Sequence, residues 1–305
     1  MFRSKHDRLF FISLLPASIA ITGVLILFIL VMLSKSYESI NTFRIELFTK
    51  SVWDPENERY GVLSPVIGTF VTSVISVALA IVLSIPLSIS TVEFLHGRIR
   101  DVVSSLVELM GGIPTIIYAI WSLNILAPFL KTYVMEPLHR YLGFIPLFSC
   151  RPVTGLSMFT AGVAIGISLT PYVTSLIIES YKLIPTMYRE ACLSIGATRY
   201  EMVKILLSLS RPAILASAML GFARAAGETT IAVATVGNAI SVSMCLFAPA
   251  YTVSAIIASQ YGNAGLYLYA ESVLYSAALI VLAATLLLSF AGLSMLTRWR
   301  ERIVV

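Results

Sequence analysis

The chain has 305 residues, of which 58% are hydrophobic and only 12% are charged. Soluble globular proteins carry about a quarter charged residues, so this composition excludes an ordinary soluble protein and indicates a protein of the lipid bilayer. The net charge of +5 does not indicate a nucleic-acid partner, because the basic residues follow the loops between apolar segments.

Six apolar segments are long enough to cross a membrane, which takes about 20 mostly apolar residues. In chain order they cover residues 9–34, 60–92, about 102–130, 152–179, a fifth segment that begins at Pro212, and about 264–297. The first is too long for the apolar core of a signal peptide, so we expect a retained helix. We divide the chain into residues 1–62, a membrane helix with its outer loop, and residues 63–305, the core.

Residues 240–263 are also apolar but are interrupted by Pro249 and Gly262. Because this segment is broken, we expect a short re-entrant or surface helix there and not a seventh span. With the N-terminus inside, the loops on the cytoplasmic side hold 13 Lys and Arg residues against 7 on the outer side. This asymmetry predicts a multi-pass protein of the cell membrane with both termini in the cytoplasm.

The sequence has few residues that could form a metal, catalytic or nucleotide-binding site. The three cysteines, Cys150, Cys192 and Cys245, lack CxxC spacing and the three histidines are scattered, so we expect no metal site. A Cys150–Cys245 bridge requires that both lie outside the membrane. No histidine lies beside a candidate nucleophile, which argues against an enzyme. The sequence has no G-x-x-x-x-G-K-[ST] motif, the loop that holds ATP phosphates. We therefore expect this chain to bind no cofactor, and we expect ATP to be used by a partner subunit.

Small residues interrupt the third apolar segment. Gly111, Gly112 and Pro114 break its helix near Glu108. Backbone groups freed inside a bilayer need protein or a water-filled path to satisfy them, so the break favours a position toward the bundle interior. A packing kink at small residues explains the same pattern equally well.

The longest cytoplasmic segment, residues 180–211, is patterned as two short helices. Thr186 can cap the first helix, Gly196 ends it, and an amphipathic helix resumes near Arg199. Two helices at an angled turn can present a protrusion to the groove of a partner. An interfacial helix pair resting on lipid headgroups is an equal alternative from the residues alone.

Two opposite charges stand inside the apolar fifth segment. Arg224 and Glu228 are four residues apart, which places them on one face of a continuous helix. A charge at this depth must face protein or water and is a functional hypothesis by default. We therefore expect Arg224 to face a translocation path with Glu228 weakening its grip on an anion. The alternative is a structural ion pair between helices.

Four stretches resemble one family, the permeases of phosphate-specific ABC importers. "EACLSIGATRYEMVKILL" resembles their EAA loop, although Cys192 replaces an alanine and Ser208-Leu209 stands where Leu-Pro is usual. "MGGIPTIIYAIWSL", "GFARAAGETTIAVATVGNA" and "LFAPAYTVSAIIASQYGNA" resemble three further segments, more like the PstC-type than the PstA-type subunit. The resemblance runs from about residue 63 to the end of the chain.

This resemblance implies an all-α fold, the six-helix MetI-like bundle of type I ABC-importer permeases. It implies that the chain forms half of a pore and couples to an ATPase subunit through Glu190, Ala191, Gly196, Ala197 and Arg199. The substrate path would include Arg224, Glu228 and Thr229.

The partners implied are a PstA-type permease in a heterodimer, ATP-binding subunits inside, a phosphate-binding protein outside, and membrane lipid, with no nucleic acid. The anion stays open, since phosphonate, sulfate and molybdate permeases share this architecture, and so does the PstA-type alternative. A secondary transporter is disfavoured, because the sequence has no internal repeat by eye and its mid-span acid, Glu228, stands beside a base.

Overall fold

The computed structural model describes residues 5–304 and is almost entirely helical. The N-terminal part comprises helix α1 (Lys5–Thr49), the two-residue strands β1 (Trp53–Asp54) and β2 (Arg59–Tyr60), α2 (Leu63–Ile89), the π-helical turn η1 (Ser90–Phe94) and α3 (Gly97–Gly112). A nearly continuous helix follows, made of α4 (Thr115–Trp121), η2 (Ser122–Leu126), α5 (Ala127–Leu130), η3 (Lys131–Met135) and α6 (Glu136–Leu142). The C-terminal part comprises the short 3₁₀ turn η4 (Pro146–Phe148), α7 (Met158–Lys182), α8 (Thr186–Ser194), α9 (Arg199–Ala226), α10 (Thr230–Thr235), α11 (Val253–Ala264) and α12 (Ala270–Val304).

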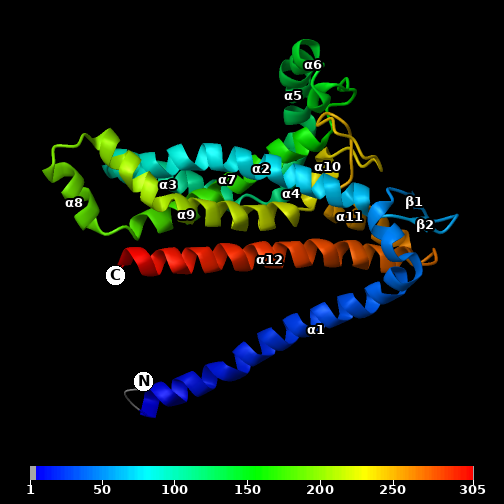
Figure 1. Ribbon diagram of the computed structural model, residues 1–305, viewed down its shortest axis with the longest axis horizontal. Coiled ribbons are helices and arrows are strands. Elements are labelled where there is room, and N and C mark those ends of the chain that lie inside the picture. Colours follow the sequence, from blue (N-terminus) through cyan, green and yellow to red (C-terminus); the bar gives the residue numbers. More distant parts are fainter. Residues whose placement is uncertain (1–4, 305) are drawn as a thin grey trace.

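Six helical segments of the described chain are long and apolar enough to cross a membrane, as the sequence predicts. They are Ser13–Thr49, Leu63–Phe94, Thr115–Leu142, Met158–Lys182, Arg199–Ala226 and Ala270–Ile303. α11 has 12 residues, too short to span, which confirms the short helix expected between the fifth and sixth spans. α2, α7, α9 and α12 lie lengthwise beside one another, with α8 and the C-terminus at one end and the β1–β2 hairpin at the other, while α1 diverges from α12 toward its N-terminal end (Figure 1).

The third span differs from the prediction. Residues 102–130 do not form one helix, because the chain ends α3 at Gly112 and begins α4 at Thr115. α3 carries four charged residues along its length, and none of its residues is buried. The membrane-crossing segment is therefore Thr115–Leu142, and Glu108 belongs to α3 outside it.

Two π-helical turns widen this third span, and each ends two residues before a proline. η2 precedes Pro128 and η3 precedes Pro137. Proline has no N–H for the i→i−4 bond, and its ring crowds the carbonyl of the preceding turn. A widened turn lets the helix continue past the ring. As a result, α5 and α6 extend away from the bundle near its hairpin end (Figure 1).

α7 is the most buried of the six spans, and α1 is the least buried of them. In the most apolar stretch of α7, 61% of residues are buried, against none in that of α1. α7 packs closely on α2 because glycines face it: a Cβ at Gly162 would meet Ile75, and one at Gly166 would meet the Ser76 carbonyl. The hydroxyl of Ser84 also donates to the Thr170 carbonyl, at 3.1 Å.

The hairpin end is closed by aromatic side chains. Tyr60 packs edge-on against Phe43 and Trp53, with ring centroids 5.7 and 5.2 Å apart. Burial, and then the carboxylates of Glu58 and Asp54, raise the pKa of Tyr60 to about 12. The phenol therefore stays protonated and donates to the Leu268 carbonyl at 2.9 Å, which ties the hairpin to the start of α12.

A disulfide joins Cys150 to Cys245 at this same end of the molecule, with a Cα–Cα distance of 6.1 Å. The sequence left this pairing open. The bond connects the loop before α7 to residues 236–252, which have no helix of their own. Disulfides persist in oxidising compartments, and both cysteines lie at the end of the molecule for which the sequence predicts outer loops.

Candidate functional site

α9 is a single helix that joins the polar loop of residues 183–198 to the apolar bundle. It begins at Arg199 and ends at Ala226, with Pro212 inside it. The sequence predicted a span that starts at Pro212, separate from the helix of the loop. In the structure the two are continuous, because α9 runs through Pro212 without a break.

The same helix ends earlier than the motif suggested, and this separates Arg224 from Glu228. Gly227 follows the last helical residue, and Glu228 lies in the turn before α10. The Glu228 carboxylate accepts a hydrogen bond from the Ile231 N–H at 3.4 Å. The Ser254 hydroxyl donates to the backbone carbonyl of Glu228 at 2.7 Å. Among the described residues, no carboxylate is within ion-pair distance of Arg224. The expectation that Arg224 and Glu228 share one face of a continuous helix is wrong, because α9 ends before Gly227.

Arg224 instead packs on an aromatic ring of α7. Its guanidinium carbon lies 4.6 Å from the centroid of Tyr172, and its side chain is exposed at the surface of the chain. A cation over a tyrosine face is stabilised by about 0.5–2 kcal/mol, more where water is excluded. Nothing in the sequence pattern pointed to Tyr172, which is 52 positions away.

The depth of Arg224 follows from its neighbours. Ala223 and Ala226 line a cavity of 540 Å³ opposite Ala278, Leu282 and other residues of α12. These α12 residues are near the middle of an uncharged stretch, residues 272–297. Arg224 is therefore exposed at about mid-membrane depth, where an arginine facing lipid costs about 2.5–3.5 kcal/mol even on the mildest scale.

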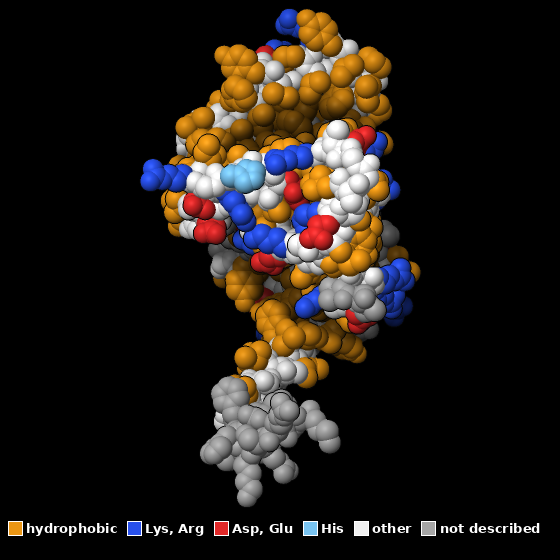
Figure 2. All heavy atoms as spheres, turned by 90° about the vertical axis from the view of Figure 1, so that its left-hand side faces the viewer, with side chains coloured by type: hydrophobic (Ala, Val, Ile, Leu, Met, Phe, Trp, Pro, Cys, Tyr) orange, Lys and Arg blue, Asp and Glu red, His pale blue; other side chains and the backbone are white. Residues whose placement is uncertain are grey.

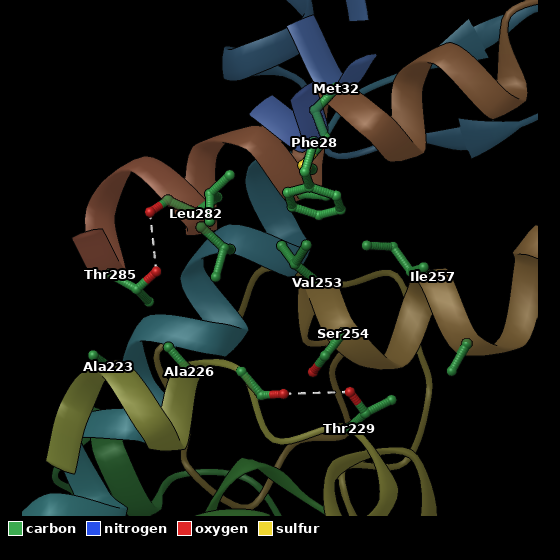
Figure 3. Close-up of a pocket in the computed structure, with 14 residues that line it drawn as sticks. Phe28, Met32, Ala223, Ala226, Thr229, Val253, Ser254, Ile257, Leu282 and Thr285 are labelled. Carbon is green, nitrogen blue, oxygen red and sulfur yellow. Dashed lines mark hydrogen bonds between the residues drawn. The ribbon is translucent and has the colours of Figure 1, made fainter. Parts of the chain in front are cut away.

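Thr229 belongs to that cavity, and Arg224 does not. Figure 3 shows Thr229 beside Ser254 on one side, with Phe28 and Met32 of α1 on the other. The Thr229 hydroxyl donates to the Gly227 carbonyl at 3.3 Å. The three residues expected in one substrate path, Arg224, Glu228 and Thr229, thus lie around the α9–α10 turn without meeting at one point.

The helix break of the third apolar segment lies next to Tyr172, the residue on which Arg224 packs. A Cβ at Gly111 would meet Pro171 at 3.5 Å, and Pro171 directly precedes Tyr172. The break at Gly111, Gly112 and Pro114 is confirmed as the boundary between α3 and α4. It is not inside the bundle of this chain: nothing lies within 4 Å of a Cβ at Gly112, and Met110 and Ile113 are each 36% exposed.

These elements together form what we call the mid-membrane face: Arg224, Tyr172, Pro171 and the α3–α4 break. The Tyr118 hydroxyl donates to the Met110 carbonyl at 2.9 Å and holds the break. The face combines an unpaired cation with interrupted backbone, features tolerated at this depth only against protein or water.

The second candidate site is the coupling tip, the turn between α8 and α9. Gly196 has a positive φ of 80°, a conformation that favours glycine. Glu190, Ala191, Gly196 and Arg199 are exposed and Ala197 is half-buried. Apolar side chains protrude beside them, with Ile195 80% and Met187 65% exposed.

The tip is held by both helices. Thr198 caps α9 in a capping box with Glu201, its backbone N–H donating to the carboxylate at 2.8 Å. Met202, Val203 and Leu206 are buried in a cluster with Cys192 and Trp299, so the helix that begins at Arg199 is amphipathic here, as expected. The expected cap was wrong, because α8 begins after Pro185 and Thr186 is already inside it.

An ion pair missed in the sequence anchors α8 to the rest of the protein. The Arg189 Nε donates to Glu93 Oε1 at 3.1 Å, with only 21% and 11% of the two side chains exposed. Arg189 also donates to the Ile184 carbonyl at 3.2 Å. The residues are 96 positions apart, so no local pattern could pair them.

Basic side chains gather around this end of the molecule, with acidic ones among them. Figure 2 views the end that carries α8 and the C-terminal end of α12. The described part of the chain has no group of three or more His, Cys, Asp or Glu side chains that could hold a metal ion. The coupling tip and Arg224 of the mid-membrane face thus lie at opposite ends of one helix, α9.

Comparison with known proteins finds a matching family model, related permeases and a similar fold. A family model described as "binding-protein-dependent transport system inner membrane component" matches residues 80–302. The probable phosphate transport system permease protein PstC of Methanocaldococcus jannaschii is 39% identical over 93% of this chain and 92% of its own. PstC of Mesorhizobium japonicum is 34% identical over 84% and 80%. Among solved structures, the inward-facing MetNI methionine ABC transporter matches with a TM-score of 0.52 at 19% identity, over 78% of this chain and 94% of that one, a likeness of fold.

Proposed function

The chain belongs to the family of binding-protein-dependent transport system inner membrane components, in its PstC branch, and we propose that it is one permease half of an ATP-driven importer of inorganic phosphate. The observation that carries the proposal is the exposed, unpaired Arg224 at mid-membrane depth. A guanidinium can hold two oxygens of a phosphate with parallel hydrogen bonds.

We propose that the mid-membrane face meets a PstA-type permease and that the translocation path runs between the two chains. Such an arrangement would give Arg224 water or protein to face instead of lipid. Stacking on Tyr172 fixes the guanidinium without neutralising it, so the charge stays free for an anion. Glu228 and Thr229, in the adjoining turn, would tune access at the end of α9.

ATP-binding subunits on the cytoplasmic side are the proposed partners of the coupling tip. Exposed Glu190 and Ile195, presented at a rigid turn, suit insertion into a groove of an ATPase. Because α9 runs without interruption from the tip to Arg224, a displacement of the tip would move the arginine with it. A phosphate-binding protein would dock at the opposite, disulfide-bonded end.

The test of function is uptake of labelled phosphate at low external concentration in cells with and without the gene. Loss of uptake on deletion, with competition by unlabelled phosphate and not by sulfate, molybdate or a phosphonate, is expected. Competition by another oxyanion would reassign the substrate. Uptake that continues without ATP, or a purified complex without an ATPase, would favour a secondary transporter.

Orientation is tested separately with single cysteines. An impermeant thiol reagent added to intact cells should label cysteines placed at Asn57 in the hairpin or at His139 in α6, both at the expected outer end, and spare one placed at Ser194 in the coupling tip. The background for this experiment replaces buried Cys192 and leaves the Cys150–Cys245 bond intact. Labelling at Ser194 from outside would overturn the proposed topology.

A further inference from the structure

A basic cavity lies between α9 and α12 near the coupling end, apart from both candidate sites. It has a volume of 280 Å³ and is lined by Pro212, Ser294, Met295, Arg298, Trp299 and Arg302. The two arginines are four residues apart on one helix face, and both are exposed. Among the described residues, neither has a carboxylate within ion-pair distance. The cavity is thus a cationic recess, and no carboxylate in the described part of the chain neutralises it.

The wall of this recess is fixed. The Trp299 indole N–H donates to the Leu209 carbonyl at 2.8 Å and ties α12 to α9 at this level. Trp299 is only 5% exposed. Tryptophan and arginine at a helix end mark the level of the lipid headgroups.

An apolar groove continues from the recess toward the middle of the membrane. It has a volume of 860 Å³ and lies between α2, α9 and α12, with Phe70, Leu215, Phe222 and Leu287 among its lining residues. Met295 lines both the groove and the recess, so the two hollows adjoin.

The length of the groove matches one leaflet of a bilayer. On α12 its lining extends from Ala284 to Met295, about 17 Å at 1.5 Å per residue. The hydrocarbon of one leaflet is about 15 Å deep, half of a core of about 30 Å. Arg298 stands one helical turn beyond Met295, at the depth where a phosphate headgroup begins.

We propose that this composite hollow binds one anionic phospholipid of the leaflet on the coupling-tip side. Arg298 and Arg302 hold the headgroup phosphate, and an acyl chain lies in the groove between α2, α9 and α12. A free inorganic anion would leave the groove unused. A partner helix filling the groove would leave two arginines uncompensated at its mouth. Only a lipid with an anionic head and an apolar chain satisfies both parts, and this binding is independent of the transported anion.

The test uses the purified transporter complex in detergent with equal amounts of phosphatidylglycerol and phosphatidylcholine, and native mass spectrometry counts the retained lipids. The wild type is expected to retain phosphatidylglycerol preferentially. One basic residue near an anionic lipid is worth about a fivefold preference, so the double variant Arg298→Gln, Arg302→Gln should lower it about 25-fold. Arg300→Gln, an exposed arginine of the same helix outside the recess, is the matched control.

A variant that keeps the charge, Arg298→Lys with Arg302→Lys, should retain the preference and shows that loss of charge, not of folding, is measured. An unchanged preference in the double glutamine variant, or an equal loss in Arg300→Gln, overturns the proposal. Displacement of phosphatidylglycerol by inorganic phosphate alone also overturns it, because the arginines would then bind a free anion.

The groove is tested by a photo-crosslinking amino acid at Leu287, with exposed Leu293, outside the groove lining, as the control position. The expected product at Leu287 is a lipid adduct that is more abundant than at Leu293. A protein adduct at Leu287 would show that a partner chain covers the groove, which contradicts the lipid assignment.

Discussion

Arginines near the two ends of α9 differ in whether they have a carboxylate partner. At the coupling tip, Thr198 and Glu201 satisfy the helix start, and nearby Arg189 is paired with Glu93 at 3.1 Å. At the mid-membrane end, Arg224 has an aromatic neighbour and no carboxylate partner among the described residues. One arginine near the tip is thus neutralised by a carboxylate, whereas Arg224 keeps its charge at a depth where lipid penalises it. We infer that the Arg189–Glu93 pair stabilises the tip and that Arg224 takes part in transport, and the variants below test both inferences.

The largest effect is expected at the tip. Glu190→Arg reverses an exposed charge at the proposed ATPase contact, and ATP-driven phosphate uptake should fall to background while the protein remains inserted. Uptake in cells and membrane abundance by immunoblot are measured together. Glu301→Arg, an exposed acid at the same end on α12, is the control and should transport normally. Full transport and complex assembly in Glu190→Arg would remove the tip from the coupling mechanism.

The second effect tests whether Arg224 is used. Arg224→Gln should lower uptake about 10- to 100-fold, because a hydrogen bond to a charged group contributes about 1.5–3 kcal/mol. The complex should still assemble and keep its ATPase, since no ion pair within the described chain is lost.

A structural arginine would behave differently. Normal transport in Arg224→Gln, and in the double variant with Glu228→Gln, would show that these charges are dispensable. The single variant Glu228→Gln separates the two residues, since the structure places Glu228 outside α9 and predicts an independent effect.

The third effect concerns rigidity at the tip. Glu93→Gln leaves Arg189 partly buried without its counter-charge, and we expect the free energy of unfolding to fall by about 2 kcal/mol. The midpoint of thermal unfolding in detergent reports this loss. In a double-mutant cycle, adding Arg189→Gln should recover part of it. Additive losses in the cycle would mean that the two side chains do not interact.

The smallest effect concerns the ring beneath Arg224. Tyr172→Leu removes a cation–π contact worth about 1 kcal/mol, so apparent phosphate affinity in uptake should weaken about fivefold with little change in maximal rate. Tyr172→Phe keeps the ring face and is the matched control, expected near wild type. Equal behaviour of the two variants would mean that the ring does not position the guanidinium.

Much of the fold was predictable because lipid imposes a simple rule on sequence. Six apolar runs predicted six spans, and Pro249 with Gly262 predicted the short α11. The boundaries at residues 102–130 failed for a specific reason: a stretch of mixed hydropathy before Gly111 was joined to an apolar one after Pro114. Reading the proline as a helix start would have placed the third span correctly.

The candidate sites were predictable as segments and not as contacts. The motifs identified the coupling tip and Arg224, and the exposure of Glu190, Ala191 and Gly196 agrees with a docking role. The expected pairing of Arg224 with Glu228 failed because helix continuity was assumed across Gly227. Their roles in transport stay predictions until the variants are measured.

The sequence by itself determined the class of protein, the number of spans and the positions of its unusual charges. This is possible because each helix that crosses hydrocarbon needs about 20 mostly apolar residues in a row. Only the tertiary structure decided which partners those charges have. Glu93 and Arg189 are 96 positions apart, Tyr172 meets Arg224 across two helices, and Cys150 joins Cys245 across 95 positions. Such contacts depend on how helices pack side by side, and packing distance has no fixed relation to separation along the chain.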